Sequence, residues 1–96
     1  MGEAGQVRAR VTFRGHVQGV GFRYTTRHVA ASYAVTGFAR NEPDGSVTLV
    51  AEGKRAEVAA FVDAVAAELA AYIHERDVRW EATTGEFDGF GIQHGW

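Results

Sequence analysis

Residues 7–33 read VRARVTFRGHVQGVGFRYTTRHVAASY, and they join a strand pattern to a helix pattern through a glycine-rich segment. From Val7 to Arg14, apolar and polar side chains alternate with the period of two that a half-buried strand shows. From Phe22 to Tyr33, apolar residues instead share one helical face. The sequence therefore predicts a strand, a loop with glycines at positions 15, 19 and 21, and a helix.

The middle of the chain predicts a hairpin followed by a second helix. Residues 35–41 and 46–52 have strand character and flank Glu42-Pro43-Asp44-Gly45, whose residue types favour a tight turn. In the second of these strands we expect Val47, Leu49 and Ala51 to face the core. From Arg55 onward, apolar residues recur at spacings of three and four, which indicates a long amphipathic helix.

The C-terminal part is less regular. Residues 78–83 alternate again and predict a fourth strand, and the apolar residues Phe87, Phe90 and Ile92 predict a short edge strand. Residues 72–79 predict either an extension of the second helix or an unusual loop, so the start of the fourth strand stays open.

The predicted order of elements, βαββαβ with a small C-terminal strand, is typical of an α+β protein. We expect a ferredoxin-like split βαβ sandwich, in which an antiparallel sheet carries two helices on one face. A chain of 96 residues suits one such core. We therefore interpret residues 7–96 as a single domain and residues 1–6 as a flexible N-terminus.

Composition narrows the classes of protein to consider. The sequence contains no cysteine, which excludes a disulfide framework, a thiolate nucleophile and a zinc–thiolate site. The first residues lack the pattern of a signal peptide, and no apolar run approaches the ~20 residues of a membrane span. We expect a cytoplasmic protein that does not enter a membrane.

Charge is distributed unevenly along the chain. Residues 1–40 contain six arginines and one acid, a balance of +5, whereas residues 41–96 contain four bases and eleven acids, a balance of −7. This split favours a local anion site in the first half, while the acidic total argues against nucleic-acid binding. We interpret Arg8, Arg10 and Arg14 as the solvated face of the first strand.

The segment Gly15–Arg23 has the features of an anion cradle. It joins a strand to a helix N-terminus, so its main-chain N–H groups can converge on one ligand, and its glycines free the backbone to turn sharply. It does not match two familiar phosphate loops. A Walker A loop starting at Gly15 would need glycine at Val20, and a dinucleotide fingerprint starting at Gly19 would need glycine or alanine at Tyr24.

Arg23 occupies an unfavourable position for a cation. It lies in the first turn of the predicted helix, where the helix dipole disfavours positive charge, and Arg27 follows one turn later. A bound anion would relieve both effects, and guanidinium geometry matches two phosphate oxygens; a surface arginine packed on the sheet is the alternative. Asn41, at the end of a strand, is either a turn residue or a carboxamide that faces the cradle and holds a water.

Two segments of the sequence resemble the acylphosphatase family. Gly15–Arg23, GHVQGVGFR, is similar to the first signature of that family, and Gly37–Val47, GFARNEPDGSV, continuing to Gly53, is similar to the second. The likeness runs from the first strand to the second helix, and the ending Phe90-Gly91-Ile92 also suits the family.

The resemblance implies roles for individual residues. Arg23 would bind the substrate phosphate with the backbone amides of the loop residues Val17, Gln18, Gly19, Val20 and Gly21, and Asn41 would position the attacking water. The substrate implied is a small acyl phosphate, hydrolysed to a carboxylate and inorganic phosphate. Separately from the resemblance, we expect the protein to be a monomer. A carboxylate leaves without protonation, so positioning and charge stabilisation suffice for catalysis.

The resemblance also implies that the enzyme uses neither a cofactor nor a metal. The four histidines show no pair at a spacing of three or four, which argues against a zinc site. His16 lies in the cradle, and we interpret it as a solvated loop residue.

Three other hypotheses compete with this one. The N-terminal domain of the large carbamoyltransferases that mature hydrogenases shares the arginine loop, but proline usually follows its arginine, where this chain has Tyr24. An RNA-recognition domain would need an aromatic strand motif that residues 36–40 match poorly on an acidic chain. A small-ligand regulatory domain would not account for both signatures.

An uncovered sheet face with Phe38, together with Trp96, would favour weak self-contact between copies of the chain.

Overall fold

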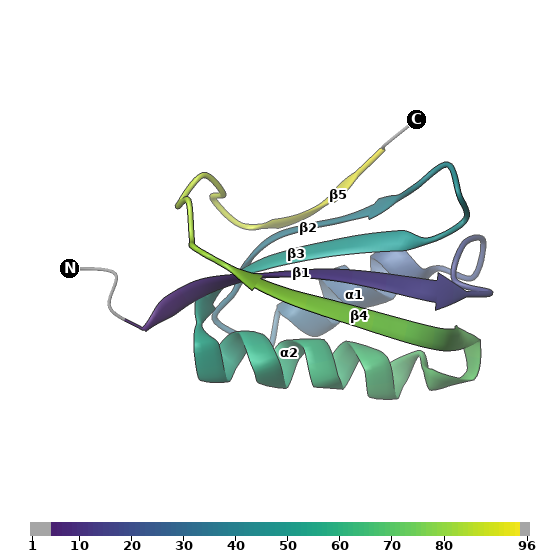
Figure 1. Ribbon diagram of the computed structural model, residues 1–96, viewed down its shortest axis with the longest axis horizontal. Coiled ribbons are helices and arrows are strands. Elements are labelled where there is room, and N and C mark those ends of the chain that lie inside the picture. Colours follow the sequence, from purple (N-terminus) through teal and green to yellow (C-terminus); the bar gives the residue numbers. More distant parts are fainter. Residues whose placement is uncertain (1–4, 95–96) are drawn as a thin grey trace.

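The computed structural model describes residues 5–94, and its element order follows the predicted one (Figure 1). Five strands, two α-helices and one turn of 3₁₀ helix make up the fold. In chain order they are β1 (Gln6–Gly15), α1 (Phe22–Ala30), β2 (Thr36–Asn41), β3 (Val47–Lys54), α2 (Arg55–Glu68), the 3₁₀ turn (Ala70–Tyr72), β4 (Ile73–Glu81) and β5 (Phe90–Gln93). Neither α-helix has the length and apolar character that a membrane-spanning segment requires.

The five strands form one sheet in the order β4-β1-β3-β2-β5. The pairs β4–β1, β1–β3 and β3–β2 are antiparallel, as expected, whereas β5 runs parallel to β2, so the sheet is mixed. The chain reaches this edge through residues 82–89, which bring β5 back beside β2 (Figure 1). The connection is long because β4 and β5 lie at opposite edges of the sheet, so the chain has to cross from one edge to the other.

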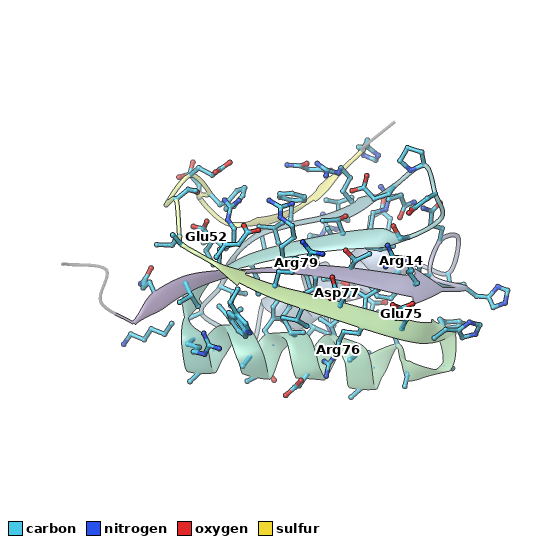
Figure 2. The ribbon with its side chains drawn as sticks, in the orientation of Figure 1. Arg14, Glu52, Glu75, Arg76, Asp77 and Arg79 are labelled. Carbon is cyan, nitrogen blue, oxygen red and sulfur yellow. The ribbon has the colours of Figure 1, made fainter. Side chains whose placement is uncertain are left out.

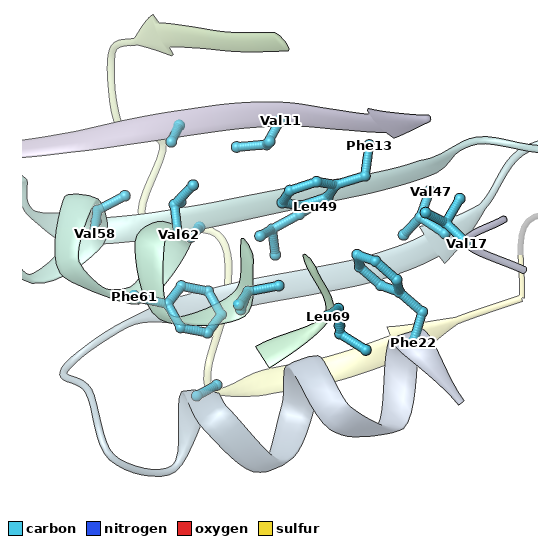
Figure 3. Close-up of a cluster of buried hydrophobic side chains, with 14 residues drawn as sticks. Val11, Phe13, Val17, Phe22, Val47, Leu49, Val58, Phe61, Val62 and Leu69 are labelled. Atoms are coloured by element: carbon cyan, nitrogen blue, oxygen red, sulfur yellow. The ribbon is translucent and has the colours of Figure 1, made fainter. Parts of the chain in front are cut away.

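Both helices pack on the same face of the sheet, which confirms the predicted α+β, ferredoxin-like architecture. The core joins alternate residues of β1 and β3 to one face of each helix (Figure 3). Val47, Leu49 and Ala51 are fully buried there, as their alternation predicted. The other large fully buried side chains include Val11, Phe13, Val17, Val58, Phe61 and Val65.

Element boundaries differ from the expected ones in several places. β1 begins at Gln6, one residue before the expected start, and β3 continues to Lys54, two residues past the expected end. α1 ends at Ala30 instead of Tyr33, because the chain turns at Ala31, Ser32 and Tyr33 with i→i−3 hydrogen bonds. Of the expected flexible N-terminus, residues 1–6, Gln6 belongs to β1, and residues 1–4 lie outside the described residues, as does the expected contact of Trp96.

Residues 72–79 form neither a longer helix nor an unusual loop. α2 ends at Glu68, and from Ile73 the chain is a regular strand that pairs with β1 along Arg8–Gly15. The charged run of residues 74–77 hid this strand, because β4 lies at the sheet edge and most of its side chains are exposed. Its pairing comes from main-chain hydrogen bonds with β1, which need no apolar alternation.

The face of the sheet opposite the helices is partly covered by residues 82–89, here called the strap. Glu52 of β3 lies beneath the strap (Figure 2) and accepts hydrogen bonds from the hydroxyl of Thr83 at 2.6 Å and from the main-chain N–H of Gly85 at 3.0 Å. Thr84 donates to the same carboxylate from both its main-chain N–H and its hydroxyl, each at 3.0 Å. The strap is thus tied to the sheet at one buried acid.

Arg8 is the counter-charge of this acid, and its expected place on the solvated face of β1 was wrong. Its Nε lies 2.7 Å from Glu52, and the residue is 8% exposed, because the strap covers it. Arg10 is half exposed and Arg14 is exposed, as expected.

Phe38 is also covered by the strap, so the expected uncovered aromatic patch is absent from this face of the described chain. Its ring packs against that of Phe87 with centroids 5.7 Å apart, and 9% of the residue is exposed. The basis for weak self-contact through Phe38 is therefore removed.

The buried pair predicts an acid-sensitive fold. Burial raises the pKa of Glu52, but hydrogen bonds from Thr83, Thr84, Arg8 and Gly85 outweigh that effect and lower the pKa from 4.5 to about 2. Because the folded-state pKa is depressed, the stabilisation is complete above the unfolded-state pKa and is lost as pH falls from about 4.5 towards 2. The shift corresponds to about 3 kcal/mol.

We expect Glu52→Gln to lower the unfolding free energy at pH 7 by about 3 kcal/mol, since the buried Arg8 would keep only the more exposed Glu86, at 2.9 Å, as its counter-charge. The variant should also show a flatter dependence of stability on pH between 5 and 2. Urea titrations at pH 7 and pH 3 measure both effects. Glu81→Gln is the matched control: it breaks an exposed pair with Arg10 and should cost under about 1 kcal/mol. Equal losses in the two variants would contradict a special role for Glu52.

Candidate active site

The loop between β1 and α1 depends on glycine at three points. Gly15 has φ 135°, and a Cβ there would collide with the main-chain carbonyl oxygen of Tyr72, where β1 and β4 approach closely at a bulge. Gly19 and Gly21 have φ of 79° and 75°, in the left-handed region that disfavours other residues. Gly21 is the N-cap of α1, so the loop turns directly into the helix.

Three side chains fix the loop to the rest of the fold. Val17 is fully buried in the core, and Val20 packs against it. Gln18 uses its Nε2 group to donate to the main-chain carbonyls of Glu42 at 2.7 Å and Ser46 at 2.9 Å. The loop is thereby tied to the turn between β2 and β3, and Figure 1 shows both at the same end of the sheet. No sequence pattern signals this brace, because its partners are main-chain atoms 24 and 28 residues away.

The start of α1 is chemically open to an anion. Among the described residues, the main-chain N–H groups of residues 17–21 donate no hydrogen bond to a protein acceptor. No side chain caps the helix, and its first turn contains no acid. Unpaired N–H groups and the positive end of the helix dipole together favour negative charge here.

A cavity of about 200 Å³ lies at this helix start. It is lined by Val17, Gly19, Gly21, Phe22, Arg23, Tyr24 and Asn41. The fold therefore brings together Arg23 and Asn41, which are 18 positions apart in the sequence. Gln18 and Val20 do not line this cavity, since their side chains hold the loop in place.

Arg23 lacks an acidic partner within residues 5–94. Its Nη1 atom donates to the main-chain carbonyl of Gln93 at 3.2 Å and lies 3.5 Å from Nδ1 of His94. By contrast, Arg40 of β2 forms an ion pair with Glu42 at 2.9 Å. Arg23 is thus oriented by the end of β5 while its charge stays uncompensated, as a residue that receives an anion requires.

His16 is exposed and does not line the cavity. Its ring packs edge-on against that of His74, with centroids 5.6 Å apart, at the ends of β1 and β4. Its main-chain N–H donates to the carbonyl of Tyr72. These contacts suit the interpretation of His16 as a solvated loop residue.

Comparison with known proteins gives a consistent result. The acylphosphatase family model matches residues 9–92. An acylphosphatase of Salinibacter ruber is 43% identical over 89 residues, which is 92% of each chain, and one of Roseiflexus sp. is 43% identical over 86 residues, 88% of this chain and 92% of that one.

Solved structures agree with these relatives. The acylphosphatase from Bacillus subtilis superposes with a TM-score of 0.81 at 28% identity, over 91% of this chain and 98% of that one. Full-length HypF superposes with a TM-score of 0.76 at 25% identity, over 94% of this chain but 12% of that one.

Proposed function

Because this chain belongs to the acylphosphatase family, we propose that the cavity at the start of α1 is the site where its acyl phosphate substrate is hydrolysed. The enzyme converts a carboxyl–phosphate anhydride into a carboxylate and inorganic phosphate. One observation carries the assignment to this cavity: it is lined by both Arg23 and Asn41.

The phosphoryl group is bound by the loop and by Arg23. The main-chain N–H groups of Val17, Gln18, Gly19, Val20 and Gly21 donate to its oxygens, and the guanidinium of Arg23 neutralises its charge. This assignment is supported by the unpaired N–H groups of the loop and by the absence of an acid from the first turn of α1. Such donors stabilise the charge that spreads over the equatorial oxygens in the transition state.

Asn41 positions the attacking water. Its carboxamide oxygen accepts a hydrogen bond from the water, and its amide group can donate one to an adjacent oxygen. The water oxygen forms a new bond to phosphorus as the bond from phosphorus to the carboxyl oxygen breaks. The electron pair of that bond leaves with the carboxylate, and the protons of the water pass to the phosphate product and to solvent. A carboxylate needs no proton to leave, so the mechanism requires no general acid.

Turnover of benzoyl phosphate in the presence of EDTA tests this proposal. We expect hydrolysis at an undiminished rate with EDTA, because the loop and Arg23 supply the positive charge that a metal would otherwise provide. A phosphate monoester such as p-nitrophenyl phosphate should react at least about a hundredfold more slowly, since its leaving group is a stronger base. Loss of benzoyl phosphate hydrolysis in EDTA, with recovery on addition of a divalent cation, would contradict a metal-independent site.

Composition, net charge and the covered sheet face support the expectations of a cytoplasmic location, no nucleic-acid partner and a monomer. A cysteine-free sequence suits the reducing cytoplasm, and a net charge of −2 argues against a nucleic-acid partner. Cover of Phe38 by the strap supports a monomer, because it removes an apolar patch from the open face of the sheet.

A further inference from the structure

Tyr24 presents an exposed aromatic ring at the wall of the cavity. It lines the same cavity as Arg23 and Asn41, yet it is 56% exposed, a large fraction for a tyrosine. The two other bulky apolar residues of the wall, Val17 and Phe22, are 0% and 2% exposed, because they belong to the core. Tyr24 is therefore the bulky apolar lining residue with surface to offer a ligand.

We propose that Tyr24 binds the acyl group of the substrate and makes the enzyme favour acyl phosphates with a flat, unsaturated acyl group over acetyl phosphate. The proposal rests on the proposed function of the cavity and adds to it the class of acyl group.

The proposal rests on the different roles that the residues lining the cavity can have. Its polar side chains, Arg23 and Asn41, are assigned to the phosphoryl group and the water. Gly19 and Gly21 have no side chain with which to contact an acyl group. Tyr24 lines the cavity of about 200 Å³ and is 56% exposed, so an acyl group that leaves the cavity towards the surface beside α1 passes its ring. Tyr24 lies where that surface meets the cavity.

Arg27 holds the ring of Tyr24. Its guanidinium carbon lies 5.4 Å from the ring centroid, within the range of a cation–π contact, and both residues are on α1 at a spacing of three. This contact restricts the rotamers of the Tyr24 ring, so less entropy is lost when an acyl group packs against it. Arg27 is thus a positioning residue that acts through Tyr24.

Comparison of two substrates with three variants tests the proposal. For wild type and for Tyr24→Ala, Tyr24→Phe and Trp80→Ala, kcat and KM are measured with benzoyl phosphate and with acetyl phosphate, together with inhibition by inorganic phosphate. We expect Tyr24→Ala to lower kcat/KM for benzoyl phosphate by about tenfold, mainly through KM, and that for acetyl phosphate by under about twofold. Tyr24→Phe keeps the ring and should keep the preference, and phosphate inhibition should be unchanged in both variants.

Trp80→Ala is the matched control. Trp80 is an exposed aromatic residue with an arginine, Arg55, stacked over its ring at 4.1 Å, but it lies on β4 and does not line the cavity. Its replacement should leave the ratio of the two kcat/KM values unchanged. Equal losses for both substrates in Tyr24→Ala, or no loss for either, overturns the proposal. If wild type hydrolyses neither substrate, the proposed function itself is contradicted. Failure of the Tyr24 proposal and failure of the proposed function are therefore distinguishable.

Discussion

Replacement of Arg23 by alanine is expected to lower kcat/KM for benzoyl phosphate by about a thousandfold and to abolish measurable inhibition by inorganic phosphate. Arginine contacts to a transferring phosphoryl group contribute on this scale because they neutralise the charge that develops on its oxygens in the transition state. Among the described residues, no other arginine or lysine side chain lines the cavity, so none can take over that charge. Steady-state kinetics with phosphate as a competitive inhibitor measures both effects.

Loss of folding cannot account for this result. Arg23 lies in the first turn of α1 and pairs with no acid in residues 5–94, so its removal relieves an unfavourable interaction with the helix dipole. We expect the unfolding midpoint of Arg23→Ala to stay within a few degrees of wild type, the lost hydrogen bond to Gln93 being exposed. Arg79→Ala, which removes an exposed arginine of β4, is the control for net charge and should keep full activity. Retention of phosphate inhibition in Arg23→Ala would contradict the assignment.

Replacement of Asn41 by alanine is expected to lower the rate of hydrolysis while phosphate binding is kept, unlike replacement of Arg23, which removes phosphate binding. We expect kcat to fall by about a hundredfold or more, while KM and inhibition by phosphate change by under about twofold. Loss of a residue that orients only the attacking water removes an interaction made on the way to the transition state and leaves ground-state binding intact. The comparison of kcat with the phosphate inhibition constant distinguishes this role from that of Arg23.

Replacement of Asn41 should leave the fold intact. In the described part of the chain, the carboxamide of Asn41 makes no hydrogen bond to a protein group, and β2 is held by main-chain pairing with β3. Stability should therefore change little, which a urea titration can check. Thr36→Ala, at the other end of β2, is a control for a shortened polar side chain on the same strand and should keep wild-type kcat. An Asn41→Ala enzyme with unchanged kcat would refute the water-positioning role.

Strong local patterns predicted most of the fold. The alternation in β1 and β3 and the apolar stripe of α2 are imposed by burial against one core, so the sequence has to record them. β4 had no such constraint over residues 74–77, because an edge strand exposes its side chains and is held by backbone hydrogen bonds with β1. Those bonds are the same for every residue type except proline, so they leave no trace in the sequence.

Local patterns in the sequence also predicted part of the candidate site, whereas the rest depends on the strand order. Gly19, Gly21 and Arg23 are visible in the sequence, because left-handed backbone angles need glycine and an unpaired cation at a helix start is locally unfavourable. The proximity of Asn41 to Arg23 depends on the strand order, which places β3 between β1 and β2 and brings their loop ends to one end of the sheet.

The sequence by itself thus determined the identity of the elements, the anion-binding character of the first loop and the likeness to one family. The tertiary structure decided which distant groups meet: Gln18 with the turn carbonyls, Arg8 with Glu52, and Tyr24 and Asn41 in one cavity. The reason is physical. Backbone conformation and burial act through neighbours in the chain and leave periodic patterns, whereas hydrogen bonds and ion pairs across the sheet depend on strand order and on long connections that no local pattern encodes.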